Sequence, residues 1–178
     1  MRTWLITDTH FGHKMMMEYC GRPESFNEDI LRNMSKLIAK EDILIHLGDV
    51  CIGNDIMWHE NLMDHVACKK WLVKGNHDRK SNSWYIGHGW DWVGYQFSDT
   101  YYGKKILFSH RPLPNWSNNG FDFNIHGHFH NSNHHIKDPE WIQSPKHKLL
   151  AIENTNYCPV TLQHFIKEAI ENENSITL

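Results

Sequence analysis

Short apolar runs in the sequence are repeatedly followed by side chains that can bind metal ions. Seven carboxylate, amide or imidazole groups stand at such positions: Asp8, His10, Asp49, Asn76, His110, His128 and His130. Oxygen and nitrogen ligands of these types suit manganese, iron, zinc or nickel, and they require no thiolate. Taken singly, each position has a plainer explanation as a turn, a cap or a strand end. Their joint occurrence, in order and each after an apolar run, predicts a metal site.

The apolar runs are interpreted as buried β-strands because they are short and are bounded by Gly and Asx residues. The strands predicted before the seven groups are Thr3–Thr7, Ile43–Leu47, Lys70–Lys74, Lys105–Ser109 and Phe121–His126. In open α/β sheets, ligands gather at the carboxyl ends of the strands, where loops converge on one point. We therefore expect the seven groups to lie together at one edge of the fold.

Helical spacing of apolar residues appears between the first two predicted strands. The segment Glu24–Lys40 has this spacing, with Ser25 or Asn27 as its N-cap and Glu28 completing a capping box with Ser25. Two further helices are predicted at Asp55–Cys68 and Thr161–Glu173. Two further strands are predicted at Trp92–Phe97 and Lys148–Glu153. This alternation of strands and helices predicts a layered α/β domain.

Length and composition limit the classes of protein that the chain can represent. Its 178 residues favour one domain, residues 1–178. With 18 Lys and Arg against 21 Asp and Glu, the formal charge of −3 excludes a strongly basic nucleic-acid coat protein. The 15 histidines exceed what packing requires and point to metal binding or acid–base chemistry.

The spacing of the cysteines and the absence of a long apolar run bear on the cellular compartment. The cysteines are widely spaced and form no CxxC pair, so we expect reduced thiols in a cytoplasmic protein. The first apolar stretch reaches Asp8 at once, so no secretory leader is expected. No run approaches the roughly 18 residues of a membrane span, and no membrane partner is expected.

Longer local motifs carry a resemblance to a known family. They are DTHFGH at Asp8–His13, HLGDV at His46–Val50, GNHD at Gly75–Asp78, SHRP at Ser109–Pro112, HGHFHN at His126–Asn131 and NYCPVTL at Asn156–Leu162. In this order they resemble the calcineurin-like metallophosphoesterase superfamily, in particular its compact single-domain bacterial and bacteriophage members. The resemblance implies a metallo-dependent phosphatase-like fold, an α-β-β-α sandwich with two mixed β-sheets.

The resemblance also implies two adjacent divalent metal ions bridged by Asp49. One ion would be held by Asp8, His10, Asp49 and His130, and the other by Asp49, Asn76, His110 and His128. Manganese is the favoured metal, with iron, zinc or nickel as alternatives. A water or hydroxide shared by the metals would be the nucleophile that attacks phosphorus. The expected activity is therefore hydrolysis of a phosphoester.

Four residues beside the ligands receive further roles from this comparison. His77 would donate a proton to the leaving alkoxide, and Asp78 would orient His77 by accepting its other ring proton, unless Asp78 caps a loop instead. His13 and Arg111 are candidate contacts of the substrate phosphate, with surface or structural roles as the alternative.

Within the superfamily, the sequence favours a phosphodiesterase acting on nucleotides or another small diester, because the chain has little room for a domain enclosing one metabolite. Phosphomonoesterase and nuclease activities use the same metals and stay open. A catalytically idle metal-bound scaffold is the non-enzyme alternative, disfavoured by the intact ligand set. Ile52 occupies a position where many members carry an Asp, which puts the local structure in doubt. We expect a bacterial cell or a phage-infected host as the setting, and the oligomeric state is left open.

Overall fold

Two β-sheets make up the centre of the computed structural model, which describes residues 1–113, 120–131 and 144–168. The first sheet has the order β4-β3-β2-β1-β9. Its strands are β4 (Trp92–Gly94), β3 (Lys69–Val73), β2 (Ile43–His46), β1 (Thr3–Ile6) and β9 (Val160–Thr161). All neighbours in this sheet are parallel except β9, which runs antiparallel to β1.

The second sheet has the order β5-β6-β7-β8. Its strands are β5 (Gln96–Tyr101), β6 (Lys104–Ser109), β7 (Phe123–His126) and β8 (His147–Leu149). The pair β5–β6 is antiparallel, whereas β6, β7 and β8 are parallel to one another. Both sheets are therefore mixed, as the family resemblance implied.

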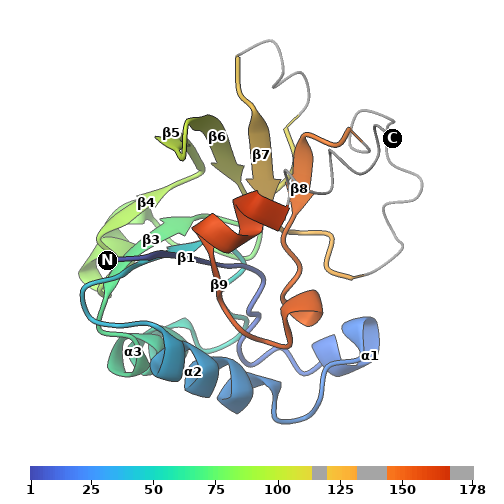
Figure 1. The fold of residues 1–178 in the computed structure, drawn as a ribbon. Coiled ribbons are helices and arrows are strands. Elements are labelled where there is room, and N and C mark those ends of the chain that lie inside the picture. The colour runs from blue at the N-terminus through green and yellow to red at the C-terminus, as the bar shows by residue number, and fades with distance from the viewer. Residues whose placement is uncertain (114–119, 132–143, 169–178) are drawn as a thin grey trace.

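Helices cover the face of the first sheet that is turned away from the second (Figure 1). The described helices include α1 (Met16–Cys20), α2 (Phe26–Leu37), α3 (Asp55–His65), α4 (Asn82–Gly87) and the 3-10 turn η4 (Ile152–Thr155). Helix α2 buries Phe26, Ile30 and Met34, which lie at the spacing of one helical face. In the described part of the chain, no helix combines the length and apolarity that crossing a membrane would need.

Each central strand of the first sheet is buried on both faces. In β1, Trp4 and Ile6 belong to the apolar cluster under the helices, and Leu5 belongs to the cluster between the sheets. This division follows from the two-residue period of a strand. From the second sheet, Ile106 and Phe108 enter the same inter-sheet cluster. The sheets are thus packed into a layered α/β fold that confirms the predicted class.

The five strands predicted before the metal-binding groups are confirmed within two residues at each end. The predicted strand Trp92–Phe97 is wrong in one respect, because it is broken at Tyr95. Strand β4 ends before that residue in the first sheet, and β5 begins after it in the second. The predicted strand Lys148–Glu153 is also cut short, because the chain leaves β8 and turns into η4.

The two internal predicted helices, Glu24–Lys40 and Asp55–Cys68, are confirmed in place but are shorter than expected. Helix α2 occupies the core of the predicted Glu24–Lys40, and its capping box is wrong. Ser25 makes no side-chain cap, because its backbone (φ −82°, ψ 8°) lies outside the β region in which a capping oxygen faces the first turn, and its hydroxyl donates to Asp29 Oδ2. Residues 162–168 are helical, and the remainder of the predicted Thr161–Glu173 helix lies outside the described residues.

Candidate metal centre

The loops after β1, β2 and β3 meet the loops after β6 and β7, at the carboxyl ends of these strands. Hydrogen bonds join the loops across the sheets. His110 Nδ1 donates to the carbonyl of Leu47 at 2.8 Å, and the amide of His128 donates to Asp8 Oδ2 at 2.9 Å. Because a carbonyl can only accept, the first bond places the proton on Nδ1 and leaves His110 Nε2 free as a ligand atom.

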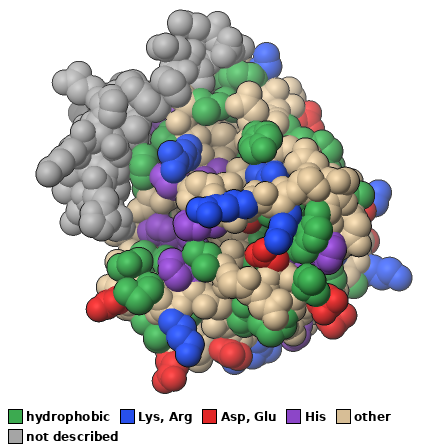
Figure 2. Space-filling model, turned by 180° about the vertical axis from the view of Figure 1, so that it is seen from behind, with side chains coloured by type: hydrophobic (Ala, Val, Ile, Leu, Met, Phe, Trp, Pro, Cys, Tyr) green, Lys and Arg blue, Asp and Glu red, His purple; other side chains and the backbone are tan. Residues whose placement is uncertain are grey.

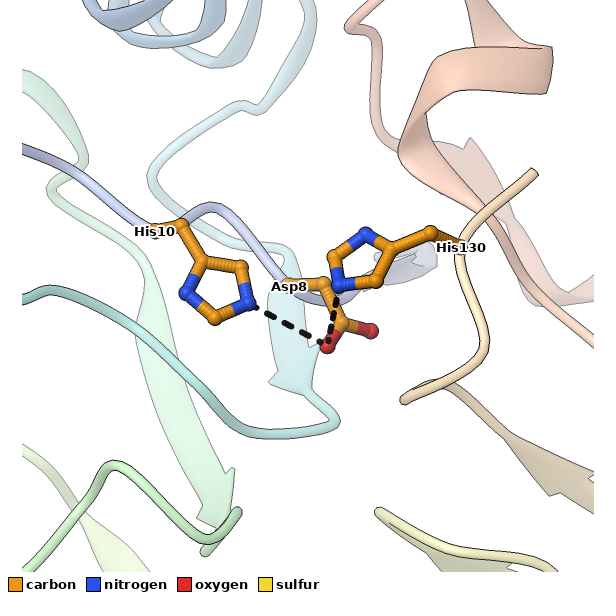
Figure 3. A group of neighbouring side chains, drawn as sticks. All are labelled: Asp8, His10 and His130. Carbon is orange, nitrogen blue, oxygen red and sulfur yellow. Dashed lines mark ion pairs between the residues drawn. The ribbon is translucent and has the colours of Figure 1, made fainter. Parts of the chain in front are cut away.

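The first ligand group consists of Asp8, His10 and His130 (Figure 3). Asp8 Oδ1 lies 3.7 Å from His10 Nε2 and 3.8 Å from His130 Nε2. Both Asp8 Oδ1 and His10 Nε2 are buried without a hydrogen-bond partner. An unpaired buried carboxylate oxygen beside an unpaired buried imidazole nitrogen is costly, and a bound cation would satisfy both. The group therefore fits a metal ion.

The second ligand group surrounds His110 Nε2. Asp49 Oδ2 lies 3.3 Å from this nitrogen, Asn76 Oδ1 lies 3.2 Å from it, and His128 Nδ1 lies 3.2 Å from it. Ligand atoms about 2.1 Å from one ion lie roughly 3.0–3.5 Å from each other, so these separations match a shared ion. The donor set of carboxylate, amide oxygen and imidazole suits a divalent transition metal.

Asp49 lies between the two groups. Its Oδ2 atom, which faces His110, is also 3.7 Å from His10 Nε2. Its Oδ1 atom accepts a 2.8 Å hydrogen bond from the amide of His77. We call Asp8, His10, Asp49 and His130 site A, and Asp49, Asn76, His110 and His128 site B. The structure thus brings together all seven side chains that the sequence singled out.

The backbone around the ligands is strained. Asp8, His10, Asp49, His128 and His130 all have positive φ, between 47° and 74°. Such conformations cost on the order of 1–3 kcal/mol each in residues other than glycine and cluster at functional sites. A close approach is also required at Gly75, where a β-carbon would overlap Asp49 Oδ1. The loops are therefore built around the positions of the ligand atoms.

Charges within the site raise the pKa values of two of its imidazoles, those of His110 and His130. Burial disfavours the charged form of His110, but the carboxylates of Asp8 and Asp49 outweigh burial and raise its pKa to about 9. The pKa of His130 is raised to about 10, because a hydrogen bond to Cys20 and the nearby carboxylates outweigh burial. Imidazole binds a metal only in its neutral form, so a bound cation would replace these protons as the partner of the carboxylates.

His77 lies at the mouth of the site. Its Nε2 atom is 4.0 Å from Asp49 Oδ2, and its side chain is 33% exposed. Its ring centroid lies 5.3 Å from that of His10. His10, Asp49 and His77 also form a group with metal-binding spacing. A partly exposed imidazole in this place can exchange protons with both a bound substrate and solvent.

Asp78 does not orient His77, and that prediction is wrong. Its carboxylate is buried and accepts hydrogen bonds from the amides of Asp49 at 2.7 Å, Gly75 at 2.8 Å and Val50 at 3.1 Å. The alternative of a loop cap is confirmed. Backbone amides that point inward at two neighbouring strand ends need an acceptor, and Asp78 supplies it. Asp78 therefore ties the loop of Asp49 to the loop of Asn76.

Substitution of Asp78 by Asn should destabilise the metal-free protein. The amide keeps the shape but loses the charge and turns an NH2 group towards backbone donors. We expect a loss of about 2–3 kcal/mol, because hydrogen bonds to charged groups contribute about 1.5–3 kcal/mol and unpaired buried donors add to the cost. The melting temperature in EDTA should fall by about 4–12 °C. The exposed Asp64→Asn on α3 is the control, and an equal melting temperature for both variants would contradict the role of Asp78.

The two candidate substrate-binding residues both border the ligands. Arg111 Nη2 donates to Asn76 Oδ1 at 3.3 Å, so its exposed guanidinium reaches site B. The ring of His13 lies 5.5 Å from that of His10, and its Nδ1 atom is buried without a partner. Figure 2 shows histidine side chains gathered on one face of the molecule, with lysine and arginine side chains beside them. Such a surface favours an anionic ligand.

His46, at the end of β2, supports the ligand loops from within the fold. Its Nδ1 atom accepts from the amide of Gly48 at 3.1 Å, and its Nε2 atom lies 3.0 Å from Thr9 Oγ1. Thr9 Oγ1 in turn donates to the carbonyl of Val50 at 2.7 Å. Burial lowers the pKa of His46 to about 3, so the ring is neutral and braces the loops after β1 and β2.

Sequence reasoning gave no supporting role to two charged residues that touch the candidate ligands. Arg22 is buried and donates to the carbonyl of Asp8 at 2.7 Å. Glu153, on η4, forms an ion pair of 2.6 Å with Arg22 and accepts from His130 Nδ1 at 3.1 Å. A signal was available at Glu153, because an acidic residue ended an apolar stretch predicted as a strand. Its partners are far away in the sequence, so the signal named no role.

Two mixed sheets with carboxylates, an amide and imidazoles gathered at their strand ends define a metal-dependent hydrolase. The family model for calcineurin-like phosphoesterases matches residues 1–174. The chain belongs to the calcineurin-like phosphoesterase family, and it is a metal-dependent phosphoesterase.

Relatives and solved structures agree with the extent of this match. The uncharacterized protein MJ1445 of Methanocaldococcus jannaschii is 28% identical over 173 residues, which is 93% of this chain and 90% of that protein. The crystal structure of AQ665, a protein of unknown function from Aquifex aeolicus, superposes with a TM-score of 0.73 at 24% identity. This likeness covers 93% of this chain and 98% of the other, and it shows the fold.

Proposed function

We propose that the protein is a two-metal phosphodiesterase that hydrolyses nucleotides or other small phosphodiesters. The observation that carries the proposal is the position of Asp49 Oδ2, 3.7 Å from His10 Nε2 and 3.3 Å from His110 Nε2. One carboxylate oxygen thus faces both ligand groups. A shared carboxylate offsets the repulsion between two cations roughly 3.5–4 Å apart, the spacing of two-metal phosphoesterases.

Site A and site B would each hold one divalent ion, with manganese favoured and iron, zinc or nickel as alternatives. Oxygen-rich sites with several imidazoles accept all four metals, so the donor set alone does not choose among them. When bound, the ions supply activation of a water nucleophile and neutralisation of charge on the phosphoryl group.

The side chains around the ligands supply the remaining steps. His77 donates a proton to the leaving alkoxide as the bond to phosphorus breaks, from a position 4.0 Å from Asp49 Oδ2. Arg111 pairs with a non-bridging phosphate oxygen, since its guanidinium already reaches Asn76 Oδ1. His13 contacts the substrate from the side of His10. These roles orient the phosphate between the ions and the proton donor.

The test compares a diester with a monoester after metal loading. Purified protein incubated with manganese should contain about two ions per chain. It should then hydrolyse bis-p-nitrophenyl phosphate at least about tenfold faster than p-nitrophenyl phosphate, in kcat/KM. Faster turnover of the monoester would favour the phosphomonoesterase alternative. Two bound ions without hydrolysis of either compound would favour the scaffold. A nuclease would be recognised by cleavage of short RNA or DNA in the same assay.

Two further expectations belong to this proposal. Residues 1–178 form one domain, which is supported by the apolar cluster that both sheets share. The protein acts in the cytoplasm of a bacterial cell or a phage-infected host, which is supported by its four free cysteines.

A further inference from the structure

Glu153 and Arg22 form a buried ion pair directly behind site A. Glu153 Oε1 accepts from Arg22 Nη2 at 2.6 Å and from Arg22 Nε at 3.0 Å. The Arg22 side chain is 0% exposed and that of Glu153 is 3% exposed. A buried pair of this kind is weak evidence for stability, because desolvation offsets most of its attraction. Its contacts with the ligand residues indicate a different purpose.

The glutamate end of the pair orients His130. Glu153 Oε1 lies 3.1 Å from His130 Nδ1, and a carboxylate in an ion pair can only accept, so Nδ1 carries the proton. The lone pair of His130 is then on Nε2, the atom 3.8 Å from Asp8 Oδ1 (Figure 3). Carboxylates behind metal-binding imidazoles fix both the tautomer and the ring direction.

The arginine end of the pair holds the other ligand segment of site A. Arg22 donates to the carbonyl of Asp8 at 2.7 Å and to the carbonyl of Thr9 at 2.8 Å. These two carbonyls belong to the turn that gives Asp8 and His10 their positive φ values of 51° and 47°. The guanidinium therefore stabilises a strained backbone that aims both ligands at one point.

Site B is held in another way. His110 is oriented by the carbonyl of Leu47, and the loops of Asp49 and Asn76 are tied together by Asp78. In the part of the chain that the structure describes, Glu153 and Arg22 form hydrogen bonds with Asp8, Thr9, His130 and each other, and none with Asn76, His110 or His128. The pair is thus connected to one of the two sites.

We propose that Glu153 and Arg22 are positioning residues that set the metal affinity of site A separately from that of site B. This inference rests on the proposed two-metal function. The pair joins the segment after β1, the segment before α2 and η4 into one support for His130, Asp8 and His10. Loss of such a support typically lowers metal affinity by about 10–100-fold.

The test measures manganese affinity of the full chain with one site at a time. His110→Ala removes a ligand of site B, and His130→Ala removes a ligand of site A. Glu153→Gln, which keeps the shape of the side chain, is added to each background. We expect Glu153→Gln to raise the manganese Kd by about 10–100-fold in the His110→Ala protein and to leave it unchanged in the His130→Ala protein. Calorimetric titration and the electron paramagnetic resonance signal of bound manganese give the readouts.

Folding effects are separated by a matched control and by a second variant. Asp42 is another buried carboxylate, which accepts from Trp4 Nε1 at 2.9 Å beyond the opposite end of β1. Asp42→Asn should lower the melting temperature in EDTA and leave both manganese affinities unchanged. The double variant Arg22→Met with Glu153→Gln has no unpaired buried charge, and it should still lose affinity at site A.

Equal loss at both sites, or no loss at site A, would overturn the inference. Failure of the proposed function has a different signature in the wild-type chain, which would then bind fewer than two manganese ions or bind two without hydrolysing the diester. Excess manganese gives an independent readout. It should restore diester hydrolysis by Glu153→Gln in the otherwise unaltered chain, whereas a merely misfolded protein would not recover.

Discussion

Replacement of Asp49 by Asn should abolish tight binding of both metal ions. Hydrolysis of a phosphodiester should fall by at least about a thousandfold, the equivalent of roughly 4 kcal/mol of lost transition-state stabilisation. The physical reason is that Asp49 Oδ2 faces His10 and His110 at once, so one substitution removes charge from site A and site B. An amide oxygen is a weaker ligand and cannot offset the repulsion of two cations.

Metal analysis after manganese loading measures this loss directly, together with kcat/KM for bis-p-nitrophenyl phosphate. The matched control is Asn76→Ala, because Asn76 contributes only to site B and lies 3.2 Å from His110 Nε2. That variant should keep the ion of site A. If Asp49→Asn retained two tightly bound ions, Asp49 would not be the bridge. If it lost one ion and kept the other, the two groups would be independent sites.

The positions of the candidate ligands could be predicted because they depend on a local rule. Each ligand follows a strand, and parallel strands bring their carboxyl ends to one edge. Asp8 follows β1 and Asp49 follows β2, and the amide of His10 donates to the carbonyl of Asp49 at 3.0 Å. The loops therefore lie side by side for reasons that the hydrophobic pattern already contains. The grouping into site A and site B came from the family resemblance.

Other parts of the site depend on contacts that no local pattern contains. Arg22 and Glu153 are 131 positions apart and meet only because η4 passes behind the loop after β1. Asp78 follows His77 in sequence, yet its carboxylate points away towards the backbone of Asp49 and Val50. Adjacency in the chain suggested a partnership with His77, and the need to satisfy buried amides decided otherwise.

The break at Tyr95 has the same kind of cause. Residues on both sides favour extended structure, and the chain is extended on both sides. The sheet that each half joins is determined by strand pairing between distant segments. Trp92 pairs with Trp71 in the first sheet, and Phe97 pairs with Phe108 in the second. Ile52 departs from the family pattern, but the backbone around it stays hydrogen-bonded to the loop after β1. Its amide donates to the carbonyl of Phe11 at 2.9 Å.

Replacement of His77 by Ala should slow hydrolysis in a manner that depends on the leaving group. For a diester with an alkoxide leaving group, we expect a loss of about 10²–10⁴-fold in kcat, because the departing oxygen needs a proton. For bis-p-nitrophenyl phosphate the loss should be small, since p-nitrophenolate leaves without protonation. The amide of His77, which donates to Asp49 Oδ1 at 2.8 Å, is retained in Ala, so both metal sites should remain.

The comparison of leaving groups separates proton donation from other roles of this region. His13→Ala is the matched control, because its ring lies 6.3 Å from that of His77 on the same side of site A. A contact of His13 with the phosphate predicts an equal loss for both substrates. If His77→Ala slowed hydrolysis of both substrates equally, His77 would instead be a phosphate contact or a metal ligand. Loss of a bound manganese ion would identify it as a metal ligand. Unchanged turnover of the alkyl diester would exclude proton donation by His77, and the leaving oxygen would then take its proton from solvent.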